Sequence, residues 1–150
     1  MTNDVVRHAA VSLVERNLSI DPPICVLLCV WNLRYCGWTL PGGRLEEYET
    51  AEECQRRELW EETGLQTEEA TLMYEGTTGI VALLEDVGGK VSVFRVTPKS
   101  NTKDAYAESY DRPIAWFTHE YFLSVTPFRE FYLKAFAAEA EKIAKSGERL

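Results

Sequence analysis

The sequence predicts an α/β fold in which helices cover both faces of a sheet. Three observations support this prediction. Residues 24–31 form an uninterrupted run of eight apolar residues, which fits a strand buried on both faces. Residues 51–63 have the capping signals of a helix, and residues 128–136 carry an apolar stripe at helical spacing. A strand buried on both faces needs a layer on each side, and these helices are the candidates for those layers.

Length and charge limit what the chain can be. It has 150 residues, of which 45% are hydrophobic, and this suffices for one domain with a buried core. The formal net charge of -8 argues against a general binder of nucleic-acid polymers, since such proteins use clustered Lys and Arg. The start, Met1 to Asp4, lacks a signal-peptide pattern, and no apolar run reaches the length of a membrane span. We therefore expect a single cytoplasmic domain over residues 1–150 without a membrane partner.

Cysteines and histidines show no catalytic pattern in the sequence. The cysteines form no C-x-x-C pair, and two of them lie in the apolar run. We interpret them as small side chains of a protein in a reducing cytosol. They are Cys25, Cys29, Cys36 and Cys54. His8 and His119 have no nucleophile or carboxylate partner that the sequence identifies, so we expect ordinary surface or core histidines.

Before the first helix, the chain reads as two strands and a glycine turn. Residues 5–15 fit a strand, and residues 18–23 fit a loop because an Asp-Pro-Pro sequence interrupts regular structure. The apolar strand at 24–31 comes next. A turn at 32–37 then leads toward the glycines at 42–43.

After that helix, short strands are predicted to alternate with turns. Residues 70–74 fit a strand and residues 76–79 a loop. Residues 80–85 and 91–96 flank Gly88-Gly89, which is a strong signal for a two-residue hairpin.

The C-terminal third begins with a polar segment, 98–112, that lacks apolar periodicity and reads as a long loop. Residues 113–117 fit a strand, and Thr118 is placed to cap a short helix through Leu123. Thr126-Pro127 then starts a longer helix, whose last turn we expect to fray because apolar residues thin out from Glu139 to Leu150. The apolar stripe of this helix consists of Phe128, Phe131, Tyr132, Ala135 and Phe136.

The helix at 51–63 carries an acidic face. Thr50 and Glu53 fit a capping box at its start, and Gly64 fits a left-handed cap at its end. Three glutamates at positions i, i+3 and i+4 share one side with several small or apolar residues, which predicts that the carboxylates face inward. These glutamates are Glu58, Glu61 and Glu62, and the residues beside them are Ala51, Cys54 and Leu65.

Clustered inward carboxylates predict a metal site. Like charges that face a cleft are costly unless a cation joins them, and oxygen ligands favour Mg²⁺ or Mn²⁺ over zinc. The alternative is an interaction module whose acidic helix face is merely solvated. That alternative requires Trp60, on the opposite side of the helix, to be buried and the three glutamates to be exposed.

The segment Gly43 to Leu65, GRLEEYETAEECQRRELWEETGL, is similar to a known family pattern. It resembles the Nudix box at every constrained position, namely Gly43, Glu49, Arg57-Glu58-Leu59, Glu61-Glu62 and Gly64-Leu65, and Leu40-Pro41-Gly42 precedes it as in many members. The resemblance implies a Nudix-type α/β/α sandwich with a mixed central sheet. It also implies a divalent-metal-dependent hydrolase of a nucleoside diphosphate linked to another group.

The same resemblance implies roles for individual residues. Glu58, Glu61 and Glu62 match the principal metal ligands, one of which would also deprotonate the attacking water. The Gly42 carbonyl is an additional ligand candidate, and more than one Mg²⁺ or Mn²⁺ ion is expected in the site. Glu49 and Arg57 match an ion pair that holds the box together, with Arg57 orienting the acids.

Three further expectations depend on weaker signals. Glu108 in the long polar loop is a candidate for an extra metal ligand or base, and a solvated loop acid is the alternative. Arg34 in the turn at 32–37 could reach a substrate phosphate, with a solvent-facing arginine as the alternative. Since many relatives form dimers, a homodimer is also an expectation.

The absence of sequence markers typical of some Nudix subclasses narrows the range of expected substrates. No proline lies between Gln66 and Thr97, which weighs against ADP-ribose hydrolases, and no tyrosine lies from Glu75 to Ala105, which weighs against dinucleoside polyphosphate hydrolases. The remaining resemblance favours a MutT-like nucleoside triphosphate pyrophosphohydrolase. The alternatives are a nucleotide-sugar hydrolase and a nucleotide-binding regulator without turnover.

Overall fold

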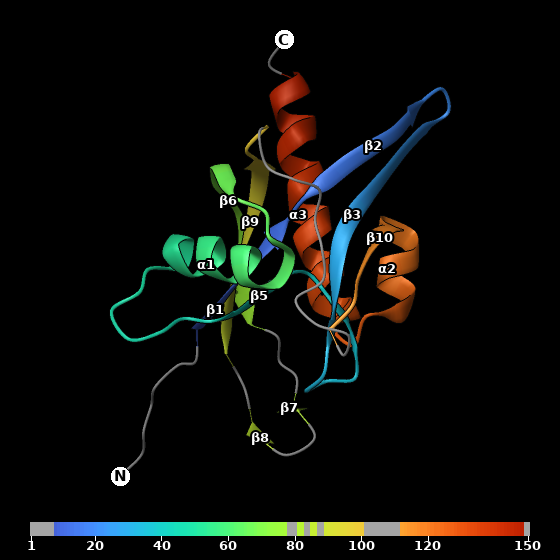
Figure 1. Ribbon diagram of the computed structural model, residues 1–150. Coiled ribbons are helices and arrows are strands. Elements are labelled where there is room, and N and C mark those ends of the chain that lie inside the picture. Colours follow the sequence, from blue (N-terminus) through green and yellow to red (C-terminus); the bar gives the residue numbers. More distant parts are fainter. Residues whose placement is uncertain (1–7, 78–80, 83–84, 87–88, 101–111, 149–150) are drawn as a thin grey trace.

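The computed structural model describes residues 8–77, 81–82, 85–86, 89–100 and 112–148 (Figure 1). Its elements are β1 (His8–Leu13), β2 (Glu15–Ile20), β3 (Pro23–Asn32), β4 (Gly37–Thr39), β5 (Gly42–Arg44), α1 (Ala51–Thr63), β6 (Thr67–Thr77), β7 (Val81–Ala82), β8 (Glu85–Asp86), β9 (Lys90–Pro98), β10 (Ile114–Thr118), α2 (His119–Val125) and α3 (Arg129–Glu148).

Eight of the described strands form two four-stranded sheets, and β7 and β8 form a separate pair. The first has the order β5-β1-β9-β6 and is mixed, because β1 runs parallel to β9 while the other pairs are antiparallel. The second is antiparallel, with the order β10-β3-β2 and with β4 also paired to β3. A hydrogen bond of 3.0 Å from the Leu28 N–H to the Val14 carbonyl joins the two sheets. The predicted mixed sheet is thus present, and an antiparallel sheet extends the layer.

Helices pack on both faces of this layer. Residues 10–14 alternate between the two sides, since Ala10 and Val14 belong to the core beside α1 while Val11 and Leu13 belong to the core beside α2 and α3. In β3, residues 26–30 are buried, with Leu28 in the first core and Leu27 and Cys29 in the second. The start of the predicted run is open, because Ile24 is 40% exposed. The arrangement of helices and strands is the predicted α/β/α sandwich, with one apolar core between the strands and α1 and another between the strands and the C-terminal helices.

The ends of α1 are those that the sequence predicts. The Thr50 hydroxyl accepts from the Glu53 N–H at 3.1 Å, and the Glu53 carboxylate accepts from the Thr50 N–H at 2.9 Å, which completes the capping box. Gly64 ends the helix with a φ of 77°, a left-handed conformation that glycine adopts without steric cost. These contacts fix where α1 begins and where it ends.

The C-terminal helix has the expected apolar stripe, with Phe131, Tyr132 and Ala135 buried. It continues to Glu148, and residues 149–150 at the predicted frayed end lie outside the described residues. Two polar contacts hold residues 139–142 of the helix to the sheet. Glu139 accepts from Arg95 at 2.9 Å, and the Lys142 ammonium donates to the Met73 carbonyl at 3.0 Å.

Two predicted loops are strands in the structure. In the expected loop at 18–23, residues 18–20 belong to β2 and Pro23 to β3, with which β2 pairs, and only Asp21 and Pro22 form the turn. The expected loop at 76–79 begins with the last two residues of β6, because β9 supplies a hydrogen-bonding partner as far as Thr77. In both cases, hydrogen bonding to a long neighbouring strand outweighs the weak preference of the local sequence for a loop.

The predicted hairpin about Gly88-Gly89 is also different. Val81 pairs with Asp86 and Ala82 with Glu85 in an antiparallel pair, and residues 83–84 and Gly88 lie outside the described residues. The strand predicted at 91–96 is correct but belongs to β9, whose partners are β6 and β1. Among the residues that the structure describes, no helix is long and apolar enough to cross a membrane.

Candidate active site

Helix α1 brings its glutamates against the glycines of β5. The Gly42 N–H donates a 2.7 Å hydrogen bond to the Glu62 carboxylate. A Cβ atom on Gly43 would lie 2.7 Å from the Glu58 Oε1 atom, so only glycine leaves room for this carboxylate. The Cys54 thiol, near the start of α1, donates to the Gly43 carbonyl at 3.3 Å and so also holds Gly43 against the helix. Two segments of the box therefore meet at the carboxylates.

The expected inward orientation is right for two of the three glutamates. The Glu58 side chain is only 16% exposed and Glu62 is half-buried, whereas the Glu61 side chain is 48% exposed. The expectation fails for Glu61 because the buried stripe of α1 runs along one side of the acidic face rather than beneath it. This stripe consists of Cys54, Gln55, Leu59 and Thr63. Trp60 is exposed, so the interaction-module alternative, which requires it to be buried, is contradicted.

Arg57 links the acids of the box. Its guanidinium donates to both oxygens of Glu49, at 2.8 and 3.0 Å, which is the ion pair expected from the resemblance. It also donates to Glu58 at 2.8 Å, to Glu61 at 3.3 Å and to the Arg44 carbonyl at 3.2 Å. A planar guanidinium suits this role, because its fork of donors fixes the direction of each carboxylate.

The two acids that share Arg57 have opposite pKa shifts. The Arg57 hydrogen bonds lower the pKa of Glu49 to about 2. Burial raises the pKa of Glu58, and the nearby charges of Glu61 and Glu49 add to this effect, although Arg57 opposes it. The ionised form of Glu58 is therefore costly in the protein alone, and a divalent cation beside it would lower that cost.

The Glu49 shift leads to a prediction about acid stability. Because its pKa falls from 4.5 to about 2 on folding, Glu49 stabilises the native state above pH 4.5, and this contribution is lost as the pH falls toward 2. We expect a loss of about 1 kcal/mol in the free energy of unfolding, allowing for solvent screening. Urea denaturation from pH 6 to pH 2 would measure it. In Glu49→Gln the fall should be smaller, and an identical fall in both proteins would refute the assignment.

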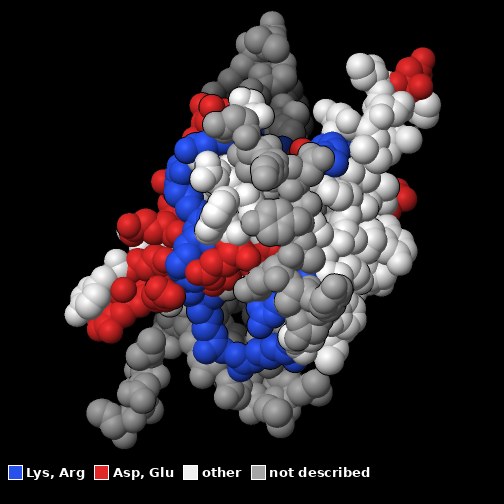
Figure 2. Space-filling model, in the orientation of Figure 1, with Lys and Arg blue, Asp and Glu red and all other residues white. Residues whose placement is uncertain are grey.

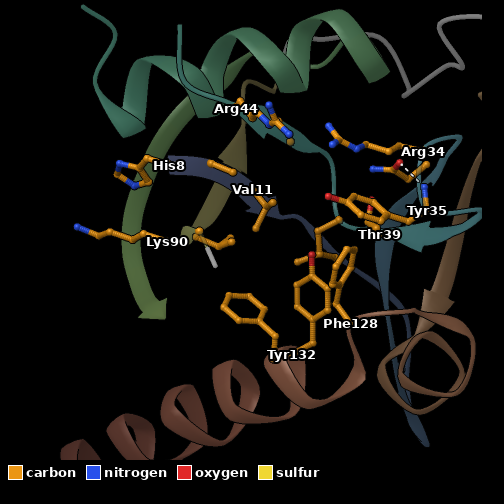
Figure 3. Close-up of a pocket in the computed structure, with 17 residues that line it drawn as sticks. His8, Val11, Arg34, Tyr35, Thr39, Arg44, Lys90, Phe128 and Tyr132 are labelled. Carbon is orange, nitrogen blue, oxygen red and sulfur yellow. Dashed lines mark hydrogen bonds between the residues drawn. The ribbon is translucent and has the colours of Figure 1, made fainter. Parts of the chain in front are cut away.

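A pocket of about 240 Å³ opens beside these glycines. One side is apolar and aromatic, with Phe128, Tyr132 and Val11 labelled in Figure 3. Arg34 and Arg44 lie across from these aromatic side chains, and Lys90 lies at another edge (Figure 3). Figure 2 shows basic side chains bordering a hollow on this face, next to a band of acidic side chains. The pocket thus offers an apolar surface and positive charge within one cavity.

Arg34 lines this pocket, and its contact with a substrate phosphate stays a prediction. Its guanidinium carbon lies 5.8 Å from the centre of the Tyr35 ring, and Tyr35 packs edge-on against Phe128 at 4.8 Å. The turn that carries both residues is closed by a 3.2 Å hydrogen bond from the Tyr35 N–H to the Asn32 side chain. Phe128 itself lines the pocket.

Sequence reasoning missed several pocket residues. Arg44 directly follows Gly43, so its place beside the box glycines was predictable from the sequence. Lys90 and His8 enter from strands far apart in the sequence, and no local pattern identifies them. His8 is not isolated, since its Nε2 lies 2.7 Å from the Ser92 hydroxyl, which donates to Glu75 at 2.6 Å. Burial and then Lys90 lower the pKa of His8, which keeps it neutral at pH 7.

The remaining ligand candidates stay predictions. The Gly42 N–H bonds to Glu62, and a role of its carbonyl as a ligand stays a prediction. Glu108 lies outside the described residues. Of the predicted ligand carboxylates, the structure therefore describes only those of the box.

Comparisons with solved structures support the architecture. A MutT NUDIX hydrolase from Burkholderia pseudomallei has a TM-score of 0.61 at 22% identity and covers 83% of this chain and 88% of its own. A MutT structure from work on the Aliivibrio salmonicida and Vibrio cholerae proteins has a TM-score of 0.64 at 13% identity, with coverages of 90% and 98%. The C. elegans Ap4A hydrolase has a TM-score of 0.63 at 18% identity, with coverages of 89% and 98%. At these identities the likeness shows the fold.

Comparisons of sequence identify the family. A MutT-like protein of Streptomyces ambofaciens is 43% identical over 84 residues, which are 54% of this chain and 47% of that relative. The match thus spans about half the length of this relative. The family model of the NUDIX domain matches residues 6–136, which include the whole acidic helix and the pocket residues named above. Because that match extends over most of the sequence, the chain belongs to the Nudix family.

Proposed function

We propose that this protein is a divalent-metal-dependent hydrolase of a nucleoside diphosphate linked to another group, and specifically a nucleoside triphosphate pyrophosphohydrolase. The observation that carries the proposal is the position of Glu58 and Glu62 against Gly42 and Gly43, at the edge of a pocket that is both apolar and basic. The apolar side fits a nucleobase, and the basic side fits phosphates. The MutT-like name of the Streptomyces relative supports the same activity.

The chemistry of the acidic residues fits magnesium or manganese. The donors are carboxylate oxygens, which hard divalent cations prefer, and the raised pKa of Glu58 indicates that its charge is poorly compensated by the protein itself. Glu58, Glu61 and Glu62 would hold the ions. When bound, the ions neutralise the phosphate oxygens and polarise the phosphorus that is attacked.

The protein's own residues supply orientation and proton transfer. Arg57 fixes the direction of Glu58 and Glu61, and the Gly42 N–H fixes that of Glu62. One of these carboxylates would accept the proton of the attacking water, whose oxygen bonds to phosphorus as the bridging P–O bond breaks. With a nucleoside triphosphate as substrate, the products are a nucleoside monophosphate and pyrophosphate. Arg34, Arg44 and Lys90 line the pocket where a chain of phosphates would be neutralised, which favours a triphosphate over a nucleotide sugar.

A substrate panel tests this proposal. Purified protein with Mg²⁺ or Mn²⁺ is given normal and oxidised nucleoside triphosphates, nucleotide sugars, ADP-ribose and Ap4A, and products are identified after reaction in ¹⁸O-labelled water. We expect release of pyrophosphate from at least one triphosphate, with a rate that rises toward alkaline pH because hydrolysis needs ionised carboxylates and a deprotonated water.

Two outcomes would contradict the proposal. Turnover that is maximal below about pH 5, where free carboxylates begin to protonate, is incompatible with metal-bound glutamates. Absence of metal-dependent turnover across the whole panel would exclude a hydrolase of these substrates. If nucleotides then raised the melting temperature without forming product, the alternative of a nucleotide-binding regulator would replace the hydrolase.

A further inference from the structure

A second group of metal-ligating side chains lies on the antiparallel sheet, away from the acidic helix. Glu15 of β2, Cys25 of β3 and His119 at the start of α2 place a carboxylate oxygen, a sulfur and an imidazole nitrogen within 4.8 Å of one another. None of the three residues lines the pocket or contacts the glutamates of the box. Their donor set of oxygen, sulfur and nitrogen is also chemically different from the all-oxygen set on α1.

We propose that Glu15, Cys25 and His119 form a binding site for a divalent cation that accepts thiolate and imidazole ligands, with Zn²⁺ as the best-fitting ion. The Glu15 Oε2 atom lies 3.2 Å from the Cys25 sulfur and 3.4 Å from the His119 Nε2. In a tetrahedral zinc site, with bonds of about 2.3 Å to sulfur and about 2.0 Å to nitrogen or oxygen, neighbouring ligand atoms lie about 3.3 to 3.5 Å apart. Two of the three distances thus match a tetrahedral site, and the third pair, the Cys25 sulfur and the His119 Nε2, lies within 4.8 Å.

Strand pairing explains why the three residues meet. Glu15 pairs with Leu27 and Asn17 pairs with Cys25, so Glu15 and Cys25 are diagonal neighbours on one face of the β2–β3 pair. On the other side of β3, Thr118 of β10 pairs with Val26, and the chain turns into α2 at the next residue, His119. Residues from three elements thus converge on one face of the sheet.

The side chains are held in place by contacts outside the cluster. Arg95 donates to the other oxygen of Glu15, which directs Oε2 toward Cys25 and His119. The charge of Arg95 is also matched by Glu139, with a hydrogen bond of 2.9 Å. The His119 ring packs edge-on against Phe136 with a centroid distance of 5.0 Å, which fixes the plane of the imidazole. These contacts are of the kind that orient metal ligands in proteins.

The charges balance when an ion is bound. In the protein alone, the Cys25 side chain is a thiol that donates to the Glu15 carboxylate at 3.2 Å. On binding, the sulfur would release its proton to solvent and form a metal–sulfur bond. Two negative ligands, Glu15 and the Cys25 thiolate, then neutralise the dication, while His119 contributes a neutral nitrogen. A coordination position remains for water, since the protein supplies three ligands.

Cobalt binding to the full-length protein tests this site separately from the acidic helix. Co²⁺ is titrated in excess Mg²⁺, and absorbance is recorded in the near ultraviolet, where only a thiolate-bound cobalt ion gives a charge-transfer band. We expect a band that saturates at a single equivalent of Co²⁺ and disappears on addition of a single equivalent of Zn²⁺. Cys25→Ser should lose the band. Cys36→Ser, which removes an exposed thiol on the turn at 32–37, should keep it.

Two further variants distinguish failure of this metal site from failure of the proposed catalytic site. His119→Gln should weaken Co²⁺ binding at least about tenfold, as for the loss of groups that support metal ligands. Glu61→Gln, which affects the proposed catalytic site, should leave the band unchanged, so failure of one proposal is distinguishable from failure of the other. A band that survives Cys25→Ser, or no band with the unaltered protein, would overturn the site. If circular dichroism shows that Cys25→Ser does not fold, an unchanged Co²⁺ affinity in His119→Gln would overturn the site instead.

Discussion

Replacing Glu62 with Gln is expected to lower kcat/KM at least about 100-fold for any substrate that the panel identifies. Glutamine has nearly the same shape and can still accept the 2.7 Å hydrogen bond from the Gly42 N–H, so the backbone contact persists. The lost group is the negative charge that would bind a metal ion or accept a proton, and such groups contribute about 10² to 10⁴ in rate. Steady-state kinetics at saturating Mg²⁺ would measure the change, and Glu61→Gln should give a decrease of the same order.

A matched control lies on the same helix. Glu52 is 51% exposed, and its contact with Arg56 at 3.7 Å lies away from the pocket, so Glu52→Gln removes one charge from α1 without touching the site. Its kcat/KM should stay within about twofold of the unaltered protein, because exposed ion pairs of this kind contribute little. If Glu62→Gln were as active as Glu52→Gln, the carboxylate of Glu62 would have no catalytic role.

The largest expected effect on stability is that of Gly42→Ala. An added Cβ would overlap the Ala10 carbonyl oxygen and lie 2.7 Å from the Val11 Cα. Both are backbone atoms of β1, which is held between β5 and β9 and cannot move aside without disturbing both neighbours. We expect the free energy of unfolding to fall by about 3 kcal/mol or more, which is in the range of severe overpacking. Urea denaturation at neutral pH would measure this loss.

Gly76→Ala supplies the comparison. A Cβ at this position of β6 would meet atoms of the Tyr74 ring at 2.8 Å, and a side chain can rotate away where a backbone cannot. Alanine also loses less backbone entropy on folding than glycine. The cost should therefore be below about 1 kcal/mol. Equal losses for Gly42→Ala and Gly76→Ala would mean that the close approach of β5 and β1 does not require glycine.

Local signals predicted the helix that carries the acids. The capping box at Thr50 and Glu53 and the left-handed cap at Gly64 depend only on neighbouring residues, and each is found at the predicted position. The Nudix resemblance and the α/β/α sandwich are likewise confirmed. The Glu49–Arg57 pair is also present, and its two residues both belong to the box, eight positions apart in the sequence.

Features formed by distant segments were not predictable in the same way. The strand β2 has few apolar residues, and it forms because β3 offers a long hydrogen-bonding partner. The orientation of Glu61 depends on how α1 is rotated against the sheet, which the packing of Gln55 and Leu59 decides. His119 and Glu15 are far apart in the sequence, and only the pairing of both β2 and β10 with β3 brings them together.

The central claim is that the acidic face of α1 holds divalent cations beside a nucleotide pocket. Its most direct test is a crystal of the protein soaked with Mn²⁺ and a non-hydrolysable nucleoside triphosphate, examined for anomalous scattering from manganese. The account predicts anomalous peaks within bonding distance of Glu58, Glu61 and Glu62, with phosphate oxygens on the far side of the ions. Bound nucleotide with no manganese at these three carboxylates would contradict it.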